Sequence, residues 1–302
     1  MDTIHIFLAS DNNYAQHAGV VIASIIYNHK GGKPIVIHYL DGGLSPENKT
    51  KIAQVVASAT GVKLVFHNMI NEFKSIPVSR HITHAAYYRL MIDKLLPATV
   101  KKAIYLDTDL VVLKDIECLW NIDIKNYALG AVEDTGLRHE INTLKEKLLI
   151  PKERKYFNSG VLLLNLCHWR ENNIGNKIMD FLLNPPLILP YHDQDAMNAV
   201  LWQDTLFIDP KWNVHKELFH HYYMLNRFRR LTKEFIDAAR DPAIVHFTGS
   251  IKPWHYACGI PYAEQYYFYI GMTPWSGYKP NDKSLKGLRK KWGWKIKKWV
   301  FR

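Results

Sequence analysis

Hydrophobic positions along the first third of the chain form short blocks that are separated by polar turns. Three apolar runs predict buried strands, over residues 3–9, 35–40 and 62–66. Between the first two runs, apolar residues over 15–28 recur at the spacing of one helical face. Ser45 and Pro46 suit the N-cap and first turn of a second helix that ends near residue 59. This alternation predicts a parallel sheet with crossover helices.

The same alternation continues to about residue 247. Four more apolar runs predict strands, over residues 102–106, 127–132, 160–166 and 243–247. Helical spacing predicts three further helices, over residues 83–96, 167–183 and 193–201. The chain has no internal repeat and no low-complexity linker. We therefore expect one α/β domain over 1–275, with its site where strand ends meet loops, and a separate tail over 276–302.

The composition is that of a globular protein with a large core. Of its 302 residues, 48% are hydrophobic and 22% are charged, which excludes a disordered chain. The three cysteines are far apart and form no C-x-x-C pair, which favours a reducing compartment over a zinc site or a disulfide framework. The N-terminus lacks a basic segment, and no stretch approaches the ~20 apolar residues that span a bilayer. We expect a cytoplasmic protein.

The net charge of +11 is concentrated at one end of the chain. Residues 283–302 contain nine Lys or Arg and no acidic residue, which leaves 11 − 9 = +2 for the rest. A nucleic-acid-binding protein would spread its charge more widely, so we expect no nucleic-acid partner. Aromatic residues interleave with these cations, namely Trp292, Trp294, Trp299 and Phe301. As a helix this tail would suit an anionic membrane surface, the alternatives being a solvated end or an oligomer contact.

Two carboxylates follow the predicted strand over 102–106. Asp107 and Asp109 flank Thr108, and residues i and i+2 of a continuing strand share one face. Two hard oxygen donors at one place suit Mg²⁺ or Mn²⁺, which in turn can bridge a diphosphate. The alternative is a turn or a helix N-cap.

A second polar segment follows the late strand over 243–247. Neutral imidazole at His246 could complete a Mn²⁺ site, Gly249 allows close backbone approach, and Lys252 could meet phosphate oxygens. The alternative is a loop histidine with satisfied hydrogen bonds and a solvated lysine. No glycine-rich phosphate loop is present, so a diphosphate would depend on metal and lysine.

Three more segments could meet a sugar or a nucleotide. Asp193, Gln194 and Asp195 could hold sugar hydroxyls or stabilise an oxocarbenium ion, although Asp193 could simply cap a helix. The stretch 157–160 before the next strand is either a turn or a source of ligand contacts. After the first strand, the stretch 11–14 could place an aromatic ring and a carboxylate on a base, or form a turn and cap.

Together these segments resemble glycosyltransferase family 8, in particular the bacterial lipopolysaccharide α-galactosyl- and α-glucosyltransferases. The resemblance extends over about residues 3–275, and its signature segments are 105–109, 157–160, 193–195 and 246–254. It implies a GT-A fold, an α/β architecture with a Rossmann-like, mainly parallel sheet between helices. It also implies retaining transfer of galactose or glucose from a UDP-hexose to a saccharide acceptor. That acceptor would be a lipid-linked lipopolysaccharide or lipooligosaccharide core at the cytoplasmic face of the inner membrane.

The resemblance also assigns roles by position. The ligands of Mn²⁺, with Mg²⁺ as the second choice, would be Asp107, Asp109 and His246. Thr108 would lie with them in the donor site. The uridine would be contacted by Ala9, Asp11, Asn13 and Tyr14. The donor sugar would be contacted by Arg89, Asn158, Gly160, Asp193 and Gln194. The phosphates would be contacted by His81, Gly249 and Lys252. Asp134 matches a position near sugar and acceptor.

These roles predict a mechanism with the metal on the leaving group. Mn²⁺ and Lys252 would neutralise UDP as the bond from C1 to oxygen breaks. Gln194 lies where a nucleophile would be sought, but a neutral amide is a poor one, so same-face attack is favoured. Gln194 and Asp193 would orient the sugar, and Asp195 is the nearest carboxylate alternative as nucleophile. Residues 211–230 match no motif and are expected to face the acceptor.

Two other classes could use the same residues in part. A metal-dependent sugar-nucleotide hydrolase or nucleotidyltransferase could also use the two aspartates, but would not require the segments 193–195 and 246–254 together. A basic nucleic-acid-binding protein is the remaining alternative, against which the confinement of charge to one tail counts.

Overall fold

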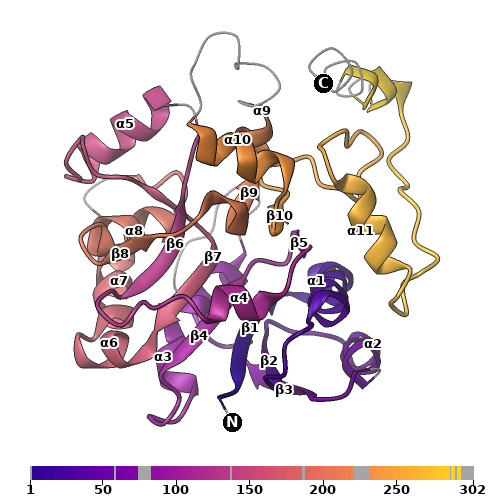
Figure 1. Ribbon diagram of the computed structural model, residues 1–302, viewed down its shortest axis with the longest axis horizontal. Coiled ribbons are helices and arrows are strands. Elements are labelled where there is room, and N and C mark those ends of the chain that lie inside the picture. Colours follow the sequence, from indigo (N-terminus) through magenta and orange to yellow (C-terminus); the bar gives the residue numbers. More distant parts are fainter. Residues whose placement is uncertain are drawn as a thin grey trace.

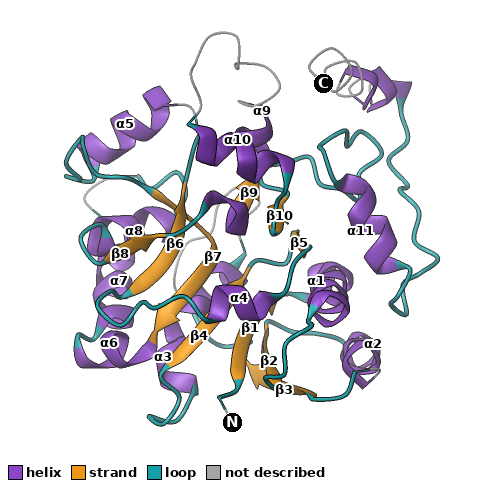
Figure 2. Cartoon of the chain, viewed as in Figure 1, coloured by secondary structure: helices purple, strands orange, loops and turns teal. Residues whose placement is uncertain are grey.

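The computed structural model describes residues 2–57, 59–73, 83–136, 138–185, 188–220, 232–285, 287–289 and 291–293. A seven-stranded sheet crosses the molecule and helices cover both of its faces (Figures 1 and 2). Its strands lie in the order β3-β2-β1-β4-β7-β6-β8. Their bounds are β1 (Ile4–Ser10), β2 (Ile35–Asp41), β3 (Val62–Asn68), β4 (Lys102–Leu106), β6 (Leu129–Glu133), β7 (Phe157–Asn165) and β8 (Thr205–Phe207).

The sheet is mainly parallel, as predicted. β3, β2, β1 and β4 pair in parallel, and so do β6 and β8. β7 is the exception, because it runs antiparallel to both β4 and β6. The predicted strand 160–166 also begins earlier than expected, since the stretch 157–160 is part of β7 rather than a turn before it.

A second, three-stranded sheet lies beside the first and was not predicted as a unit. It consists of β5 (Leu110–Val112), β10 (Ile244–His246) and β9 (Val214–His215), in that order. β5 and β9 are too short to produce a periodic pattern in the sequence. This small sheet matters for the site because it pairs His246 with Leu110, the residue that follows Asp109.

Helices fill the connections between the strands. The α-helices are α1 (Ala15–Asn28), α2 (Pro46–Ala57), α3 (Ile92–Leu95), α4 (Ile116–Trp120), α5 (Arg138–Lys147), α6 (Leu166–Glu171), α7 (Ile174–Leu183), α8 (Asp193–Leu201), α9 (Lys216–His220), α10 (Lys233–Arg240) and α11 (Ala263–Ile270). Three segments are 3-10 helices, namely η1 (Asn12–Tyr14), η2 (His84–Met91) and η3 (Pro210–Asn213).

Two predicted helices differ from the observed ones. The stretch 83–96 is mostly the 3-10 helix η2, followed by the short α3. The stretch 167–183 is divided into α6 and α7 at Asn173, whose φ of 52° is left-handed and ends the helical run. Ser45 caps α2 as expected, because its hydroxyl accepts a hydrogen bond from Asn48 N at 3.2 Å.

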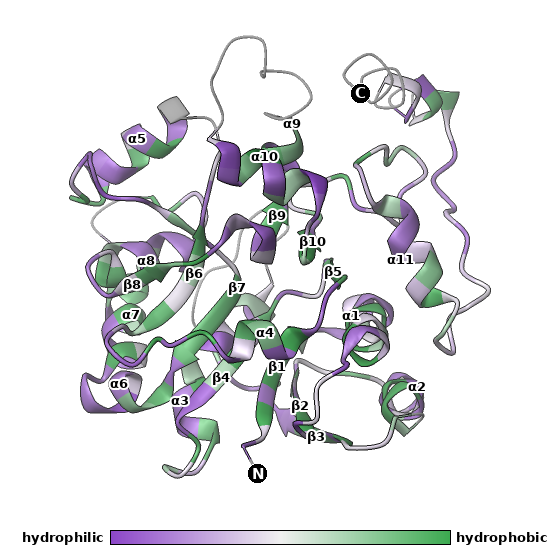
Figure 3. Ribbon diagram, in the orientation of Figure 1, coloured by the Kyte–Doolittle hydropathy of each residue, from purple (hydrophilic) through white to green (hydrophobic). Residues whose placement is uncertain are grey.

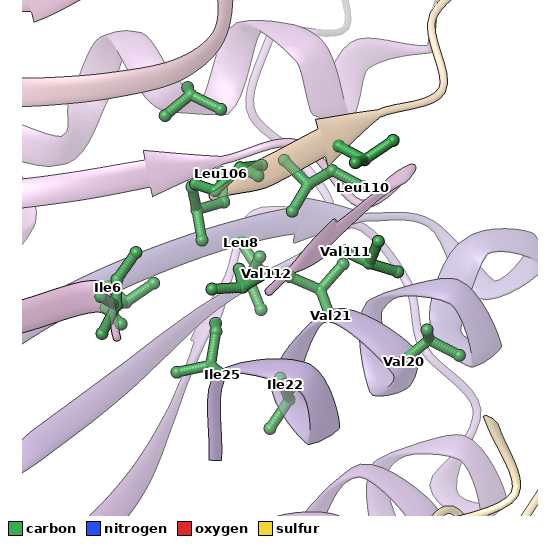
Figure 4. Packing of buried hydrophobic residues seen from close by; sticks show 14 of the residues in the cluster. Ile6, Leu8, Val20, Val21, Ile22, Ile25, Leu106, Leu110, Val111 and Val112 are labelled. Atoms are coloured by element: carbon green, nitrogen blue, oxygen red, sulfur yellow. The ribbon is translucent and has the colours of Figure 1, made fainter. Parts of the chain in front are cut away.

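Alternate residues of the central strands enter two separate cores. Ile6 and Leu8 face α1 and α2, whereas Phe7 faces η2 and the helices α6 to α8. Figure 4 shows the first core, where Ile6, Leu8 and Leu106 meet the side chains of α1 and β5. The hydrophobic character of β1 and β7 is visible in Figure 3. Burial on both faces fixes the last residues of β1 and β4 and the first residues of the antiparallel β7 at one edge of the sheet, where the site lies.

In the part of the chain described above, no helix is long and apolar enough to cross a membrane. The described part of the C-terminal stretch packs on the main body, since Tyr278 donates a hydrogen bond from its hydroxyl to Trp254 O at 3.1 Å. The boundary at residue 275 stays a prediction. Trp294, Trp299 and Phe301 of the predicted tail lie outside the described residues.

Candidate active site

Asp107 and Asp109 lie in a bend between β4 and β5, where the two sheets meet. The backbone N–H of Asp107 donates to Gly160 O at 2.8 Å, and Asp109 O accepts from Phe247 N at 2.9 Å. Thr108, between them, is buried. The bend is therefore held from one side by β7 and from the other by the end of β10, which keeps both carboxylates at the junction.

These two carboxylates and His246 form a candidate metal centre. One ligand atom from each lies within 4.8 Å of the other two. His246 Nε2 is 3.0 Å from Asp109 Oδ1 and 3.7 Å from Asp107 Oδ2. Two carboxylate oxygens and an imidazole nitrogen suit Mn²⁺ and admit Mg²⁺.

Gly160 provides the room for this cluster. A Cβ added there would lie 2.1 Å from Cε1 of His246 and 2.8 Å from Oδ2 of Asp107. Any other residue would therefore fill the place where the ligands converge. The shape of the site and the chemistry of its donors both fit a divalent cation.

The second oxygen of Asp107 is occupied by protein groups. Oδ1 accepts hydrogen bonds from Arg89 Nη2 at 2.9 Å and from Tyr105 OH at 3.0 Å. The guanidinium also lies 4.2 Å from the centre of the Tyr105 ring. Burial opposes the charge of Arg89, but Asp107 and the nearby side chains outweigh it and raise the pKa of Arg89. Oδ2 is thus the oxygen that remains for a cation.

Lys252 lies on the other side of Asp109. Its ammonium donates to Asp109 Oδ2 and to Phe247 O, the latter at 2.8 Å. Burial would raise the pKa of Asp109, but Lys252 and then His246 outweigh it and hold this pKa well below its usual range. Burial disfavours the ammonium of Lys252, yet Asp109 outweighs burial and raises the pKa of Lys252. Lysine and carboxylate both stay charged.

Gln194 is the centre of a second polar cluster, on the β7 side of the bend. Its Nε2 donates to Asp134 Oδ2 at 3.1 Å, and its Oε1 accepts from Ser159 N at 3.0 Å. Asn158 donates to the same oxygen of Asp134 at 3.2 Å. Asn158 and Gln194, expected from the sequence to face the sugar, are thus linked through Asp134.

Asp195 is buried behind this cluster. It is 0% exposed, and its two oxygens accept from Tyr156 OH at 2.6 Å and from Tyr191 N at 2.7 Å. Burial raises the pKa of Asp195 to about 6, against the effect of these hydrogen bonds. Its carboxylate holds Tyr156 and the start of α8.

Asp193 is the first residue of α8, and it does not act as the N-cap. His192 stands at the cap position with φ 49°. Asp193 Oδ2 is 3.2 Å from Arg89 Nε, but that N–H donates to Ala86 O, so the buried Oδ2 makes no hydrogen bond. Burial raises the pKa of Asp193 to about 6, although Arg89 lowers it.

The stretch after β1 forms the outer wall of the same edge. Asp11 Oδ1 accepts from Asn13 N and Tyr14 N, at 2.9 and 3.2 Å, so the turn-and-cap alternative holds for this oxygen. Tyr14 lies edge-on to Trp254 at 5.7 Å, and Trp254 stacks on His17 at 3.4 Å. Ala9, near the end of β1, is buried. Two sequence segments that lie far apart, after β1 and after β10, thus share one aromatic surface.

Comparison with known proteins identifies the family. The profile of Glycosyl transferase family 8 matches residues 5–258. The chain belongs to this family. General stress protein A of Bacillus subtilis is 36% identical over 283 residues, which cover 91% of this chain and 96% of that protein. Lipopolysaccharide 1,2-glucosyltransferase of Escherichia coli is 26% identical over 303 residues, which cover 96% and 85%.

The fold of this family 8 member is also found among solved structures. Galactosyltransferase LgtC in complex with donor and acceptor sugar analogs has a TM-score of 0.77 and 25% identity, covering 95% of this chain and 100% of that one. The family resemblance and the GT-A fold predicted from the sequence are confirmed. The protein is therefore a glycosyltransferase, which moves a sugar from a donor to an acceptor.

The family 8 segments lie together at this edge, and the roles assigned to their residues stay predictions. One predicted residue lies outside the described part of the chain, and several residues that hold the site were missed. His81 lies outside the described residues. Gly249 is in a left-handed turn, φ 80°, after β10. Three buried residues that hold the site were missed, namely Tyr105, Tyr156 and Asn213. Tyr105 had a signal, since it lies two positions before Asp107 at the end of the same predicted strand. Tyr156 directly precedes β7 and Asn213 ends η3, and neither belongs to a motif.

Proposed function

We propose that this family 8 enzyme transfers galactose or glucose from a UDP-sugar to a saccharide acceptor, with retention and with Mn²⁺ on the leaving group. The observation that carries the proposal is the convergence of Asp107, Asp109 and His246 at the end of β4. A bound divalent cation would neutralise the diphosphate as the bond from sugar to oxygen breaks.

The protein's own groups prepare the leaving-group side. Asp107 Oδ2, Asp109 Oδ1 and His246 Nε2 would hold the cation, while Arg89 and Tyr105 fix the rest of Asp107. The ammonium of Lys252 donates to Asp109. A cation would take up the charge of Asp109, so Lys252 would turn to the phosphate oxygens. His81 and Gly249 are proposed to contact the same phosphates.

The nucleotide would lie over the end of β1. The ring of Tyr14, supported edge-on by Trp254, offers a surface for the uracil base. Asp11 Oδ1 is occupied by backbone N–H groups, so its other oxygen is the one that can accept from a base N–H. Ala9 and Asn13 are proposed to complete this contact surface.

On the sugar side, the arrangement supports same-face attack. The oxygen of Gln194 already accepts from Ser159 N, and Asp195 is buried with both oxygens occupied. Neither group can approach the sugar carbon without breaking these hydrogen bonds. We assign Gln194 and Asp193 to orienting the sugar and stabilising positive charge. Asp195 would act as a positioning residue for Tyr156.

The test of this proposal is Mn²⁺-dependent release of UDP. UDP-galactose, UDP-glucose and UDP-N-acetylglucosamine are each tested with and without defined oligosaccharide acceptors. Faster release in the presence of an acceptor is expected for a transferase, whereas equal release would favour the sugar-nucleotide hydrolase alternative. Asp107→Asn and Asp109→Asn should abolish release, and unchanged release in both would refute the metal role. Gln194→Ala should lower turnover strongly.

The acceptor is proposed to be lipid-linked, like the core of lipopolysaccharide on the cytoplasmic face of the inner membrane. The similarity to the Escherichia coli glucosyltransferase and the basic C-terminal end support this. Leu285 and Trp292 are 82% and 58% exposed, which leaves apolar surface among the cations. Deleting residues 283–302 should abolish binding to anionic liposomes and preserve UDP release. Liposome binding that survives the deletion would rule out this role.

A further inference from the structure

β7 is locally irregular beside the metal centre. Leu162 pairs with Ala131 of β6, but the next pair is Asn158 with Val132, so residues 159–161 have no partner on β6. Such a bulge leaves backbone N–H groups outside the ladder. Here two of these N–H groups donate to side chains instead. Ser159 N donates to Gln194 Oε1 and Gly160 N donates to Asn158 Oδ1, both at 3.0 Å.

The N–H of Gly160 determines how the Asn158 amide is oriented. A backbone N–H can only donate, so the Asn158 atom that it meets must be the oxygen. The Nδ2 of Asn158 then points to Asp134 Oδ2, at 3.2 Å, where a donor is also required. A flipped Asn158 would place donor against donor at Gly160 and oxygen against carboxylate at Asp134. Both contacts therefore select the same orientation.

Asn158 in turn determines the orientation of Asn213. Asn213 is 0% exposed and ends η3, and its Nδ2 donates to Asn158 Oδ1 at 2.9 Å. The Oδ1 of Asn213 must then face His246 Nδ1, at 3.0 Å. An oxygen at this distance requires a proton on Nδ1.

We propose that Asn213 is a positioning residue that holds His246 in the Nδ1–H tautomer and so directs the Nε2 lone pair at the cation. The inference deepens the metal site of the proposed function and rests on it. Metal-bound histidines commonly donate their second ring N–H to a neighbouring acceptor, which fixes ring and tautomer. Here that acceptor is itself oriented by the backbone of β7.

The same hydrogen bonds connect the metal centre to the sugar side. His246 is linked through Asn213 and Asn158 to Asp134, and Asp134 to Gln194. Each side-chain amide in this series of hydrogen bonds has one allowed orientation. Ser159 N donates to Gln194 and fixes its amide, just as Gly160 N donates to Asn158 and fixes that amide. The leaving-group ligands and the sugar-orienting residues are thereby held as one unit.

The test compares Asn213→Leu with Asn213→Asp. Leucine removes both hydrogen bonds, whereas aspartate keeps an acceptor for His246 Nδ1. In the metal-free protein Nε2 faces Asp109 Oδ1 at 3.0 Å, so the proton on Nδ1 is the informative readout. ¹⁵N-imidazole NMR should show a proton on His246 Nδ1 in the wild type and Asn213→Asp, and a shift towards the Nε2–H form in Asn213→Leu. The protein has 15 histidines, so the signals are assigned by difference with His246→Gln.

Mn²⁺ affinity is then measured with UDP present, by the electron paramagnetic resonance signal of free Mn²⁺. Asn213→Leu should bind Mn²⁺ about 10- to 100-fold more weakly. Asn213→Asp should lose less affinity, because it keeps an acceptor for His246 Nδ1 although its other oxygen meets Asn158 Oδ1. The matched control is Asn165→Leu, because Asn165 is a buried asparagine at the far end of β7 that donates to Tyr127 O at 3.1 Å. It should lower the midpoint of thermal unfolding and leave Mn²⁺ affinity unchanged.

The outcomes separate this inference from the proposed function. Equal Mn²⁺ affinity in Asn213→Leu and the wild type, or a wild type without a proton on His246 Nδ1, would overturn the role of Asn213 alone. A wild type that binds no Mn²⁺, like Asp107→Asn, would refute the proposed metal site and the inference with it. A loss of affinity in Asn165→Leu equal to that in Asn213→Leu would show general destabilisation and would also overturn the inference.

Discussion

Replacing Gly160 by alanine would place a methyl group where the metal ligands converge. The added Cβ would lie 2.1 Å from Cε1 of His246 and 2.8 Å from Oδ2 of Asp107. The φ of Gly160 is not left-handed, so alanine meets no backbone penalty there. The perturbation is therefore a pure steric one, aimed at two of the three ligands.

Its magnitude follows from where the strain can go. β7 is buried along its whole length, and the backbone of Gly160 is held by two hydrogen bonds: its O accepts from Asp107 N at 2.8 Å and its N–H donates to Asn158 Oδ1 at 3.0 Å. Gly160 therefore has little freedom to retreat. Overpacking of a tight interior costs about 1–3 kcal/mol. If the ligands take up all of this strain, Mn²⁺ affinity falls about 5- to 150-fold, since 1.4 kcal/mol corresponds to a factor of ten.

The assay is a Mn²⁺ titration of Gly160→Ala with UDP present, together with UDP release at rising Mn²⁺ concentration. The expected result is weaker Mn²⁺ binding, with turnover partly restored by excess Mn²⁺. Gly130→Ala is the control, because its Cβ would meet Ile208, just after β8, at 3.2 Å, and none of its three nearest neighbours is a metal ligand. Gly130→Ala should lower the midpoint of thermal unfolding and leave Mn²⁺ affinity unchanged. Wild-type Mn²⁺ affinity in Gly160→Ala would refute the reasoning, since the ligands would then not lie as described.

Two further predictions concern charge. Burial, followed by His5 and His67, lowers the pKa of His38 to about 3, so folded His38 stays neutral while the unfolded chain takes up a proton below about pH 6.5. The unfolded state then binds more protons, so His38 alone should lower the free energy of unfolding by about 2 kcal/mol between pH 8 and pH 5, measured by urea unfolding. His38→Phe should reduce this slope, and an equal slope would contradict the assignment. A lysine at position 89 cannot keep the hydrogen bonds to both Asp107 and Ser159 O. Arg89→Lys should therefore lower the free energy of unfolding by about 3 kcal/mol and weaken Mn²⁺ binding. An unchanged midpoint of thermal unfolding would contradict this prediction.

Much of the fold was predictable because its signals are local. The buried runs that became β1, β2, β3 and β4 alternate with helical spacing, and that order already implies a parallel sheet. The direction of β7 was not predictable, because a run of buried residues reads the same in a parallel and an antiparallel strand. β5 and β9, with three and two residues, are too short to carry a period.

The two aspartates lie together, as the sequence predicts, but not because they share a strand face. β4 ends at Leu106, so Asp107 and Asp109 share no strand face, and Tyr105 contacts Asp107 through its hydroxyl, which donates to Oδ1. The two carboxylates meet because the bend is held between Gly160 O and Phe247 N. The sequence shows that two carboxylates follow a predicted strand, but it does not show which distant backbone groups fix the bend in which they lie.

The sequence by itself determined the chemical types of the site, since carboxylates, an imidazole, a lysine and amides lie at the ends of predicted strands. The tertiary structure decided which of them meet. Lys252 reaches Asp109 across 143 positions, and Asn213 reaches His246 across 33, only because β10 pairs with both β5 and β9. The tautomer of His246 depends on one backbone N–H in a strand bulge. Such contacts arise from the pairing of distant strands, whose register follows from packing over the whole domain and leaves no local trace in the residues themselves.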